Sequence, residues 1–322
     1  MRTRRWLGRL SLVLLSTFAT LAALDWRLRG EVGECGLTPF RTATVKGLPH
    51  ELFPGRTTLY KGVEVRINSI GLRGEELPAP QPDRRRIAIV GDSVTFGNGC
   101  PEDDTVPRTL AAELLRRGQP CELVNCGIPA YNADNVATMV RERVVALAPQ
   151  QVIWVMVAND VCDAHRRTEI PVDATIDAFA DFPLGSPLLQ LLNVQASGIL
   201  RALGLTLDGY VESVLRQHER TGIERLRRAL TEMKSQCAAA GIDFRVAIYP
   251  FMTRQDRNPF RPIEDSCAAL CGEMAIPCLR LSDAFAPDAN LGAYWVALLD
   301  AHPDGVANRR VAEFLAESWF KP

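Results

Sequence analysis

The sequence has almost no net charge, because 37 Lys and Arg residues face 38 Asp and Glu residues, a formal balance of -1 over 322 residues. Outside the extreme N-terminus basic and acidic residues are spread along the chain, and this excludes the electrostatic footprint of a protein that binds nucleic acid. Internal repeats and low-complexity tracts are also absent, which excludes repeat architectures. The apolar share of 47% is that of an ordinary folded body with a sizeable core.

Histidine is scarce, and cysteine follows no recognisable pattern. The chain has four histidines and nine cysteines. An odd cysteine count fits an oxidising compartment only loosely, although one or two disulfides are expected. The most metal-like group, Cys267, Cys271 and Cys278, has no histidine beside it and is better explained as core thiols or a disulfide. We therefore expect neither a metal nor a cofactor.

The one long apolar run lies at the N-terminus. Four arginines precede residues 10–24, and the run is flanked by Trp6 and Trp26. A helix between these tryptophans would be about 30 Å long, which matches the core of a bilayer. Residues 1–30 are therefore expected to be a membrane anchor with its positive end inside or, alternatively, a cleaved signal peptide. In both cases we expect the chain from Gly30 onward to be periplasmic or extracellular.

The rest of the chain divides into an extension and a main domain. Residues 31–84 are rich in Gly, Pro and charge, which indicates an extension and linker. Over residues 85–322 short apolar runs such as IAIVG and QVIWVM alternate with helical stretches. This alternation predicts parallel βαβ units and a three-layer α/β sandwich with five strands. Residues from about 161 to 207 fit poorly and indicate an inserted helical cap, although their leucines could equally be core contacts of an ordinary helix.

Three polar clusters follow predicted strands, at the edge of the sheet where ligands gather in α/β proteins. GDS places Ser93 on a tight turn with its hydroxyl exposed. NCG places Gly127 where a backbone N–H can face a cleft, and VAND places the Asn159 amide where it can donate to an oxyanion. Taken singly, each cluster also fits a turn, a helix cap or a loop glycine.

A serine nucleophile needs a base, and that base needs a group to orient it. DAHP near the C-terminus supplies Asp300 and His302 just before a predicted helix. His165 is the main competitor because acidic residues flank it, but it lies at the start of the predicted insertion. His50 belongs to the extension, and His218 lies in a charged helical stretch where a solvated side chain is expected.

The blocks GDSVTFG, NCG, VAND and DAHP, in this order and at these distances, resemble the conserved blocks of the SGNH/GDSL hydrolase family. The resemblance covers about residue 86 to the C-terminus, and NSIGLRGEE at residues 68–76 is similar to the lead-in of bacterial, membrane-anchored members. It implies a flavodoxin-like three-layer α/β/α sandwich with a five-stranded parallel sheet. It also implies Ser93 as nucleophile, a triad completed by His302 and Asp300, and an oxyanion hole formed by Ser93, Gly127 and Asn159.

The sequence departs from the family pattern at several positions. Val94 replaces the leucine of GDSL, Val157 replaces the glycine of GxND, and Ala130 stands where the second block often has another glycine. The last pair is D-x-H rather than D-x-x-H, so Asp300 is less secure than His302.

These residues predict a serine esterase that cleaves an ester through an acyl-enzyme, the substrate being a short acyl or acetyl ester of a carbohydrate or a lipid. Two alternatives remain open. An exported O-acyltransferase or deacetylase acting on cell-surface polysaccharide would use the same triad, and a non-catalytic binding module could retain the fold. The expected partners are an ester substrate and, through the N-terminal helix, the membrane; the oligomeric state is not defined by the sequence.

Overall fold

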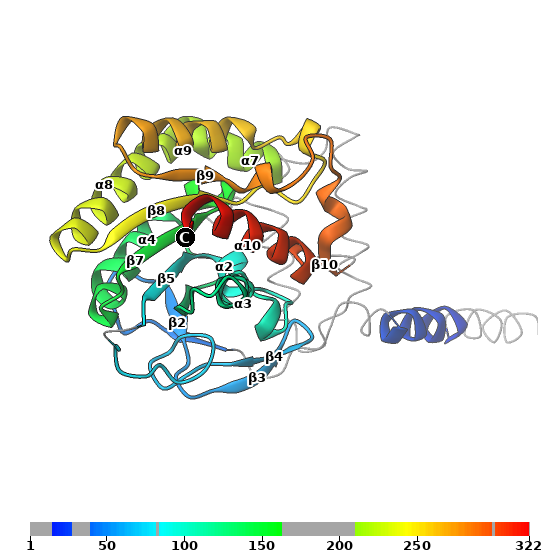
Figure 1. The fold of residues 1–322 in the computed structure, drawn as a ribbon. Coiled ribbons are helices and arrows are strands. Elements are labelled where there is room, and N and C mark those ends of the chain that lie inside the picture. The colour runs from blue at the N-terminus through cyan, green and yellow to red at the C-terminus, as the bar shows by residue number, and fades with distance from the viewer. Residues whose placement is uncertain (1–14, 28–38, 82–83, 163–209, 298–299, 322) are drawn as a thin grey trace, which may run out of the picture.

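The central element is a parallel five-stranded sheet (Figure 1). The computed structural model describes residues 15–27, 39–81, 84–162, 210–297 and 300–321. Within them the sheet has the strand order β6-β5-β7-β8-β9. Its first strand in chain order, β5, therefore lies between its second, β6, and its third, β7. This is the flavodoxin-like order. The strands are β5 Arg86–Gly91, β6 Glu122–Gly127, β7 Gln151–Met156, β8 Asp243–Ile248 and β9 Cys278–Arg280.

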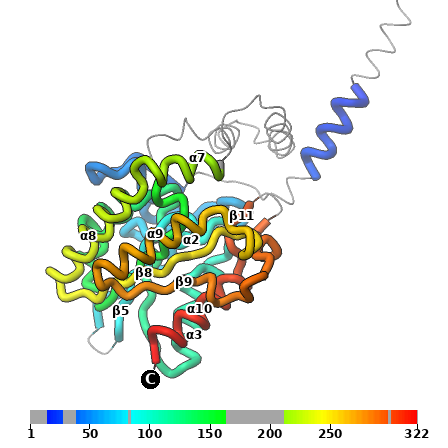
Figure 2. The backbone as a smooth tube through the Cα atoms, turned by 90° about the horizontal axis from the view of Figure 1, so that it is seen from above, coloured from blue at the N-terminus to red at the C-terminus, as the bar shows by residue number. Residues whose placement is uncertain are grey.

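Helices cover both faces of the sheet, and the alternation of side chains along each strand supplies both cores. Trp154 of β7 belongs to the cluster under one set of helices, whereas its neighbour Ile153 belongs to the cluster under the other. Figures 1 and 2 show the two layers on opposite sides of the sheet. One layer holds α4 Ala133–Met139, α8 Ile223–Ala239 and α9 Arg261–Glu273; the other holds α3 Val106–Arg116 and α10 Gly305–Trp319. The predicted three-layer sandwich is confirmed.

Shorter elements complete the described part of the chain. The helix α2, Ser93–Phe96, follows β5 directly, and a 3-10 turn at Ala158–Val161 follows β7. Three antiparallel pairs lie outside the main sheet, β1 with β2, β3 with β4, and β10 with β11. Their bounds, with that of the remaining long helix, are β1 Phe40–Thr42, β2 His50–Leu52, β3 Thr57–Tyr60, β4 Val63–Arg66, β10 Trp295–Ala297, β11 Asp300–Pro303 and α7 Tyr210–Gln217.

Residues 39–81, which the sequence indicates as an extension, pack onto the sandwich. Leu52, Val65 and Leu72 are buried in the same cluster as the helices beside β6. Arg73 forms an isolated antiparallel bridge with Asn125 of β6. The extension therefore covers the edge of the sheet that β6 would otherwise expose.

The N-terminal helix spans residues 15–27, and it lies apart from the α/β body in Figures 1 and 2. Its apolar side chains, including Phe18 and Trp26, are exposed. Within the described residues no helix has the length and apolar character needed to cross a bilayer. Residues 1–14, which include the first part of the expected anchor, lie outside the described residues, and so does the predicted cap from residue 163 onward.

The expectation of a disulfide is not met among the eight cysteines that the structure describes, all of which are free thiols. Cys267 and Cys271 are fully buried on the inner face of α9, where they pack in the core as small apolar side chains.

Candidate active site

Ser93, His302 and Asp300 converge at one end of the sheet. The Ser93 hydroxyl lies 2.8 Å from Nε2 of His302. The other ring nitrogen, Nδ1, is in direct hydrogen-bond contact with Oδ1 of Asp300. Because Nδ1–H donates to a carboxylate, Nε2 is left as the acceptor for the Ser93 proton. The structure therefore brings together the three residues that the sequence predicts as a triad.

The local sequence explains why Ser93 is presented at this point. Gly91 ends β5 at φ 156 with a Cβ-sized space already filled, since an added Cβ would lie 2.3 Å from the Thr95 hydroxyl. Asp92 then caps α2 by accepting the Val94 N–H at 2.9 Å. Ser93 occupies the first position of this short helix, half-buried. Its hydroxyl can thus face a substrate while its backbone stays fixed.

Asp92 links the nucleophile to the loop after β7. Its Oδ2 accepts the Asn159 side-chain amide at 3.3 Å and lies 3.2 Å from the Ser93 hydroxyl oxygen. Burial raises the pKa of Asp92, although the Val94 N–H, the charge of His302 and the two side-chain bonds oppose this effect. The Asn159 amide has two N–H groups, so it can bind Asp92 and still donate to a substrate oxygen.

The third triad member lies in a polar setting. The carboxylate of Asp300 also accepts a bond from Lys61 Nζ, at 2.8 Å from its Oδ2. Burial alone would raise the pKa of Asp300, but the hydrogen bond and charge of His302 and the charge of Lys61 hold it well below its ordinary value. Asp300 is therefore a carboxylate over the whole range in which His302 can act as a base.

The expected role of Gly127 is not supported by its surroundings. Its N–H donates to Oδ1 of Asn125 at 3.0 Å rather than facing an open cleft. A Cβ at this position would lie 2.2 Å from the backbone nitrogen of Phe96. Glycine is required there because α2 passes directly over β6, which corrects the expectation that Gly127 presents a free N–H to the substrate.

Ala130 offers an N–H that the sequence argument overlooked. It lies three residues after β6, at φ 65, a left-handed conformation that is uncommon for alanine. Within the described part of the chain, neither its N–H nor that of Ser93 donates a hydrogen bond to the protein. The signal was present in the sequence, because the second family block often has a glycine at this position.

The remaining histidines are placed elsewhere. His218 was expected to be solvated, but it is 5% exposed, and its Nε2 lies 3.1 Å from the Ser266 hydroxyl. Burial lowers the pKa of His218, because the short helical segment that carries it packs against Ser266 of α9 and the turn at Ala158–Val161. His50 binds the Pro129 carbonyl at 2.8 Å. His165 lies outside the described residues.

Asp160 is fully buried beside the site. Its Oδ2 accepts the Val157 N–H at 3.1 Å and so closes the turn that carries Asn159. Burial, followed by the nearby charge of Asp92, raises the pKa of Asp160 well above its ordinary value.

The extension also supports α2, the helix that begins with Ser93. The guanidinium of Arg73, which is 3% exposed, donates to the carbonyls of Phe96, Gly97 and Cys100 at 2.6–2.9 Å. These carbonyls belong to the end of α2 and the turn after it. Burial lowers the pKa of Arg73 to about 10.

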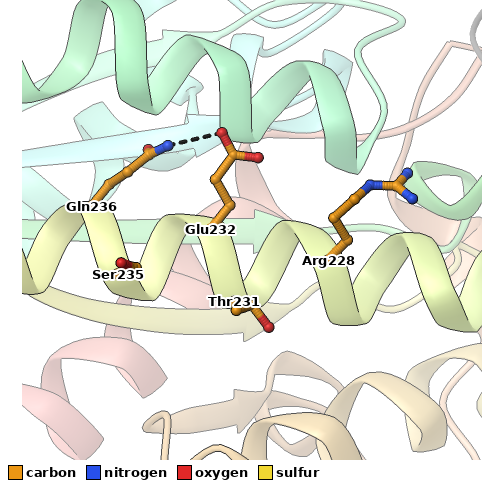
Figure 3. Close-up of a pocket in the computed structure, with 5 residues that line it drawn as sticks. All are labelled: Arg228, Thr231, Glu232, Ser235 and Gln236. Atoms are coloured by element: carbon orange, nitrogen blue, oxygen red, sulfur yellow. Dashed lines mark hydrogen bonds between the residues drawn. The ribbon is translucent and has the colours of Figure 1, made fainter.

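A hollow on the outer surface lies on α8, away from the elements that carry the triad. Figure 3 shows its lining on one side of α8, where the Gln236 amide donates to Glu232. Arg228 there pairs with Asp134 of α4 at 2.7 Å, so this hollow belongs to the α4–α8 surface. Among the described residues no group of three or more His, Cys, Asp or Glu side chains could hold a metal ion.

Comparison with known proteins gives matches among solved structures alone. No protein-family model matches the sequence, and no curated protein matches it. A GDSL-like lipase from Bacteroides thetaiotaomicron is 14% identical over 75% of this chain and 90% of its own, with a TM-score of 0.40. A carbohydrate acetylesterase from Sinorhizobium meliloti is 13% identical over 73% and 97%, with a TM-score of 0.42. An aryl esterase from M. smegmatis is 14% identical over 72% and 97%, also at 0.42.

Proposed function

We propose that the chain is a serine esterase whose nucleophile is Ser93. The observation that carries this proposal is the continuous contact from the Ser93 hydroxyl through the His302 ring to the Asp300 carboxylate. A serine hydrogen-bonded to an imidazole that is itself oriented by a carboxylate is the arrangement that acyl transfer requires. The order of the blocks, which resembles the SGNH/GDSL hydrolases, supports the same activity.

The proposed reaction has two halves. His302 Nε2 takes the Ser93 proton while Oγ attacks the ester carbonyl carbon, and the carbonyl oxygen becomes an oxyanion. Collapse of this intermediate breaks the bond to the alcohol, which leaves with the proton from His302, and an acyl-enzyme remains. Water then attacks the acyl carbon as His302 takes its proton, and the acid departs as Ser93 regains a proton.

The Ser93 N–H, the Asn159 amide and the Ala130 N–H are the proposed donors to the oxyanion. The Pro129–Ala130 bond is trans, so the Ala130 N–H points away from the carbonyl that His50 binds. His50 packs against Tyr131 on the extension side of this loop, at 5.4 Å between ring centroids. In a structure with a phosphonate bound to Ser93, the phosphoryl oxygen should lie within about 3.2 Å of the Ala130 nitrogen, the upper limit of a normal N–H···O hydrogen bond.

Turnover of p-nitrophenyl acetate by the full chain in detergent tests the activity. Wild type should release nitrophenol, and Ser93→Ala should not, because the attacking oxygen is removed. Ser69→Ala, at an exposed serine of the extension, is the matched control and should retain turnover. Equal turnover by wild type and Ser93→Ala would contradict the proposal.

The acceptor is tested in the same assay. An exported O-acyltransferase on cell-surface polysaccharide would pass the acyl group to a sugar hydroxyl in place of water. Adding an oligosaccharide and measuring acetylated product against free acetate separates the two: a hydrolase gives acetate alone, and a transferase gives acetylated sugar in excess.

We further propose that residues 1–30 anchor the protein in a membrane, with the domain outside the cytoplasm. The exposed apolar side chains Leu15, Phe18, Leu21 and Leu24 in the N-terminal helix support this, as do the arginines before it. The full chain should stay with carbonate-washed membranes, and Phe18→Arg with Leu21→Arg should release it. An intact mass lacking the N-terminal segment would show that the segment is instead cleaved.

A further inference from the structure

The turn between β3 and β4 places a lysine against the Asp300 carboxylate of the triad. Lys61 Nζ lies 2.8 Å from Oδ2 of Asp300, a residue 239 positions later in the chain. The other oxygen of the same carboxylate contacts His302. One carboxylate thus joins a lysine of the extension to the catalytic imidazole, and neither the sequence blocks nor the proposed mechanism makes use of that lysine.

The hairpin that carries Lys61 is tightly defined. Lys61 and Gly62 have φ of 50 and 80, and they connect Tyr60 to Val63, which pair directly across the two strands. Two successive positive φ values are those of a type I′ hairpin turn, in which lysine is an unusual choice. The ring of Tyr60 also packs edge-on against Phe96 of α2, with centroids 6.2 Å apart. The lysine therefore approaches Asp300 from a support that also contacts the nucleophile helix.

We propose that Lys61 is a positioning residue of the triad, which holds the Asp300 carboxylate against His302 and offsets the negative charge around the base. This inference rests on the proposed serine esterase function. Lys61 positions the base through the Asp300 carboxylate, which its Nζ contacts at 2.8 Å.

The charges around the base are predominantly acidic, so the lysine has a definite electrostatic effect. Asp92 from the start of α2 interacts with His302. Asp304 at the start of α10 and Asp104 from the turn before α3 interact, like Asp300, with the nearby thiol of Cys100. Arg309 of α10 pairs with Asp104 at 2.6 Å. Among the described residues, the charged groups around the base therefore include Lys61, Asp92, Asp104, Asp160, Asp300 and Asp304.

Removing the lysine charge leaves this acidic surrounding less balanced, and the protonated imidazole is then favoured. The base would become active at a higher pH than in wild type. Loss of a unit charge close to the base shifts the midpoint of the pH–rate profile by about 0.5–1 pH unit. A looser Asp300 also lowers the rate at saturating pH, by about 10-fold.

The test is the rate of Ser93 phosphonylation by a fluorophosphonate as a function of pH, measured on the full chain. Lys61→Met should move the acidic midpoint upward by about 0.5–1 pH unit and lower the plateau, whereas Lys61→Arg should restore both. Lys46→Met is the matched control, because Lys46 is exposed on the β1–β2 connection; its profile should equal that of wild type. Lys61→Gln replaces the methionine variant should that variant fail to fold.

A double-mutant cycle with Asp300→Asn shows whether Lys61 acts through the carboxylate. In the Asp300→Asn background, Lys61→Met should lower the plateau no further, because the lysine positions the base through that carboxylate. A folded Lys61→Met with the wild-type midpoint and plateau overturns the Lys61 inference while leaving the esterase proposal intact. Wild type that does not react with the probe at any pH overturns both.

Discussion

The imidazole of His302 lies 2.8 Å from the hydroxyl of Ser93, although 209 residues separate them in the chain. Ser93 follows the first strand of the sheet, and His302 lies in β11, directly before the last helix. Parallel strands bring their carboxyl ends to one edge, and α10 packs along α3, which follows the nucleophile turn. The topology thus brings the two ends of the domain to one site.

Loss of individual triad members should follow a definite order. His302→Ala should lower kcat by about 10⁶-fold and Asp300→Asn by about 10⁴-fold, because the carboxylate orients the base and does not take the proton. Turnover of p-nitrophenyl acetate at neutral pH measures both, with circular dichroism as the check on folding. Equal losses, or a larger loss in the Asp300 variant, would contradict these roles.

The Asn159 amide should act in the transition state. Asn159→Ala should lower kcat by about 10²- to 10³-fold with little change in KM, since one oxyanion donor is removed. Asn98→Ala is the comparison and should lower kcat less, because the Asn98 amide makes only a long contact, 3.5 Å, with Nε2 of His302. A change in KM alone for Asn159→Ala would show that the amide binds the substrate equally in the ground state.

Arg73 should be critical for stability, in contrast to Arg66 of the same extension. Arg73→Met removes three hydrogen bonds to the carbonyls of Phe96, Gly97 and Cys100 and should lower the free energy of unfolding by about 3–5 kcal/mol. The Arg66 side chain is 48% exposed, in ion pairs with Glu75 and Glu102. Arg66→Met should therefore cost less than about 1 kcal/mol. Urea denaturation measures both, and similar losses would refute the account of Arg73.

Asp160 should make stability fall as the pH rises. Its folded pKa is raised, so between the unfolded value of about 3.9 and the folded value the native state binds more protons than the unfolded chain. Relative to Asp160→Asn, wild type should lose about 1.4 kcal/mol for each unit of that difference as the pH rises through this window. Unfolding free energies measured from about pH 4 to about pH 7 test this; a constant difference between the two proteins would contradict it.

The sheet and the triad could be predicted from the sequence because their signals are local. The run from Ile87 to Val90 is wholly apolar and lies between β6 and β7 inside the sheet, and Ser93 follows it three residues later. His302 was identified by elimination among four histidines and by its place before a helix. Both arguments need only strand ends and chain order.

Other features depend on contacts that no local pattern encodes. The direction of the Gly127 N–H is set by the Asn125 side chain, so the oxyanion role expected for Gly127 could not be checked from spacing. His218 is buried because α9 and the turn after β7, both distant in the sequence, pack against it. Lys61 and Arg73 reach the site from a segment that looks like a linker in composition, and only the folded chain shows what they bind.

The central claim is that Ser93 is a nucleophile activated by His302, and covalent labelling tests it most directly. The folded full chain is treated with a fluorophosphonate, and the modified peptide is identified by mass spectrometry. The account predicts an adduct on Ser93, absent in Ser93→Ala and strongly slowed in His302→Ala. A folded wild-type protein that carries no adduct, or carries it on another residue, would contradict the account.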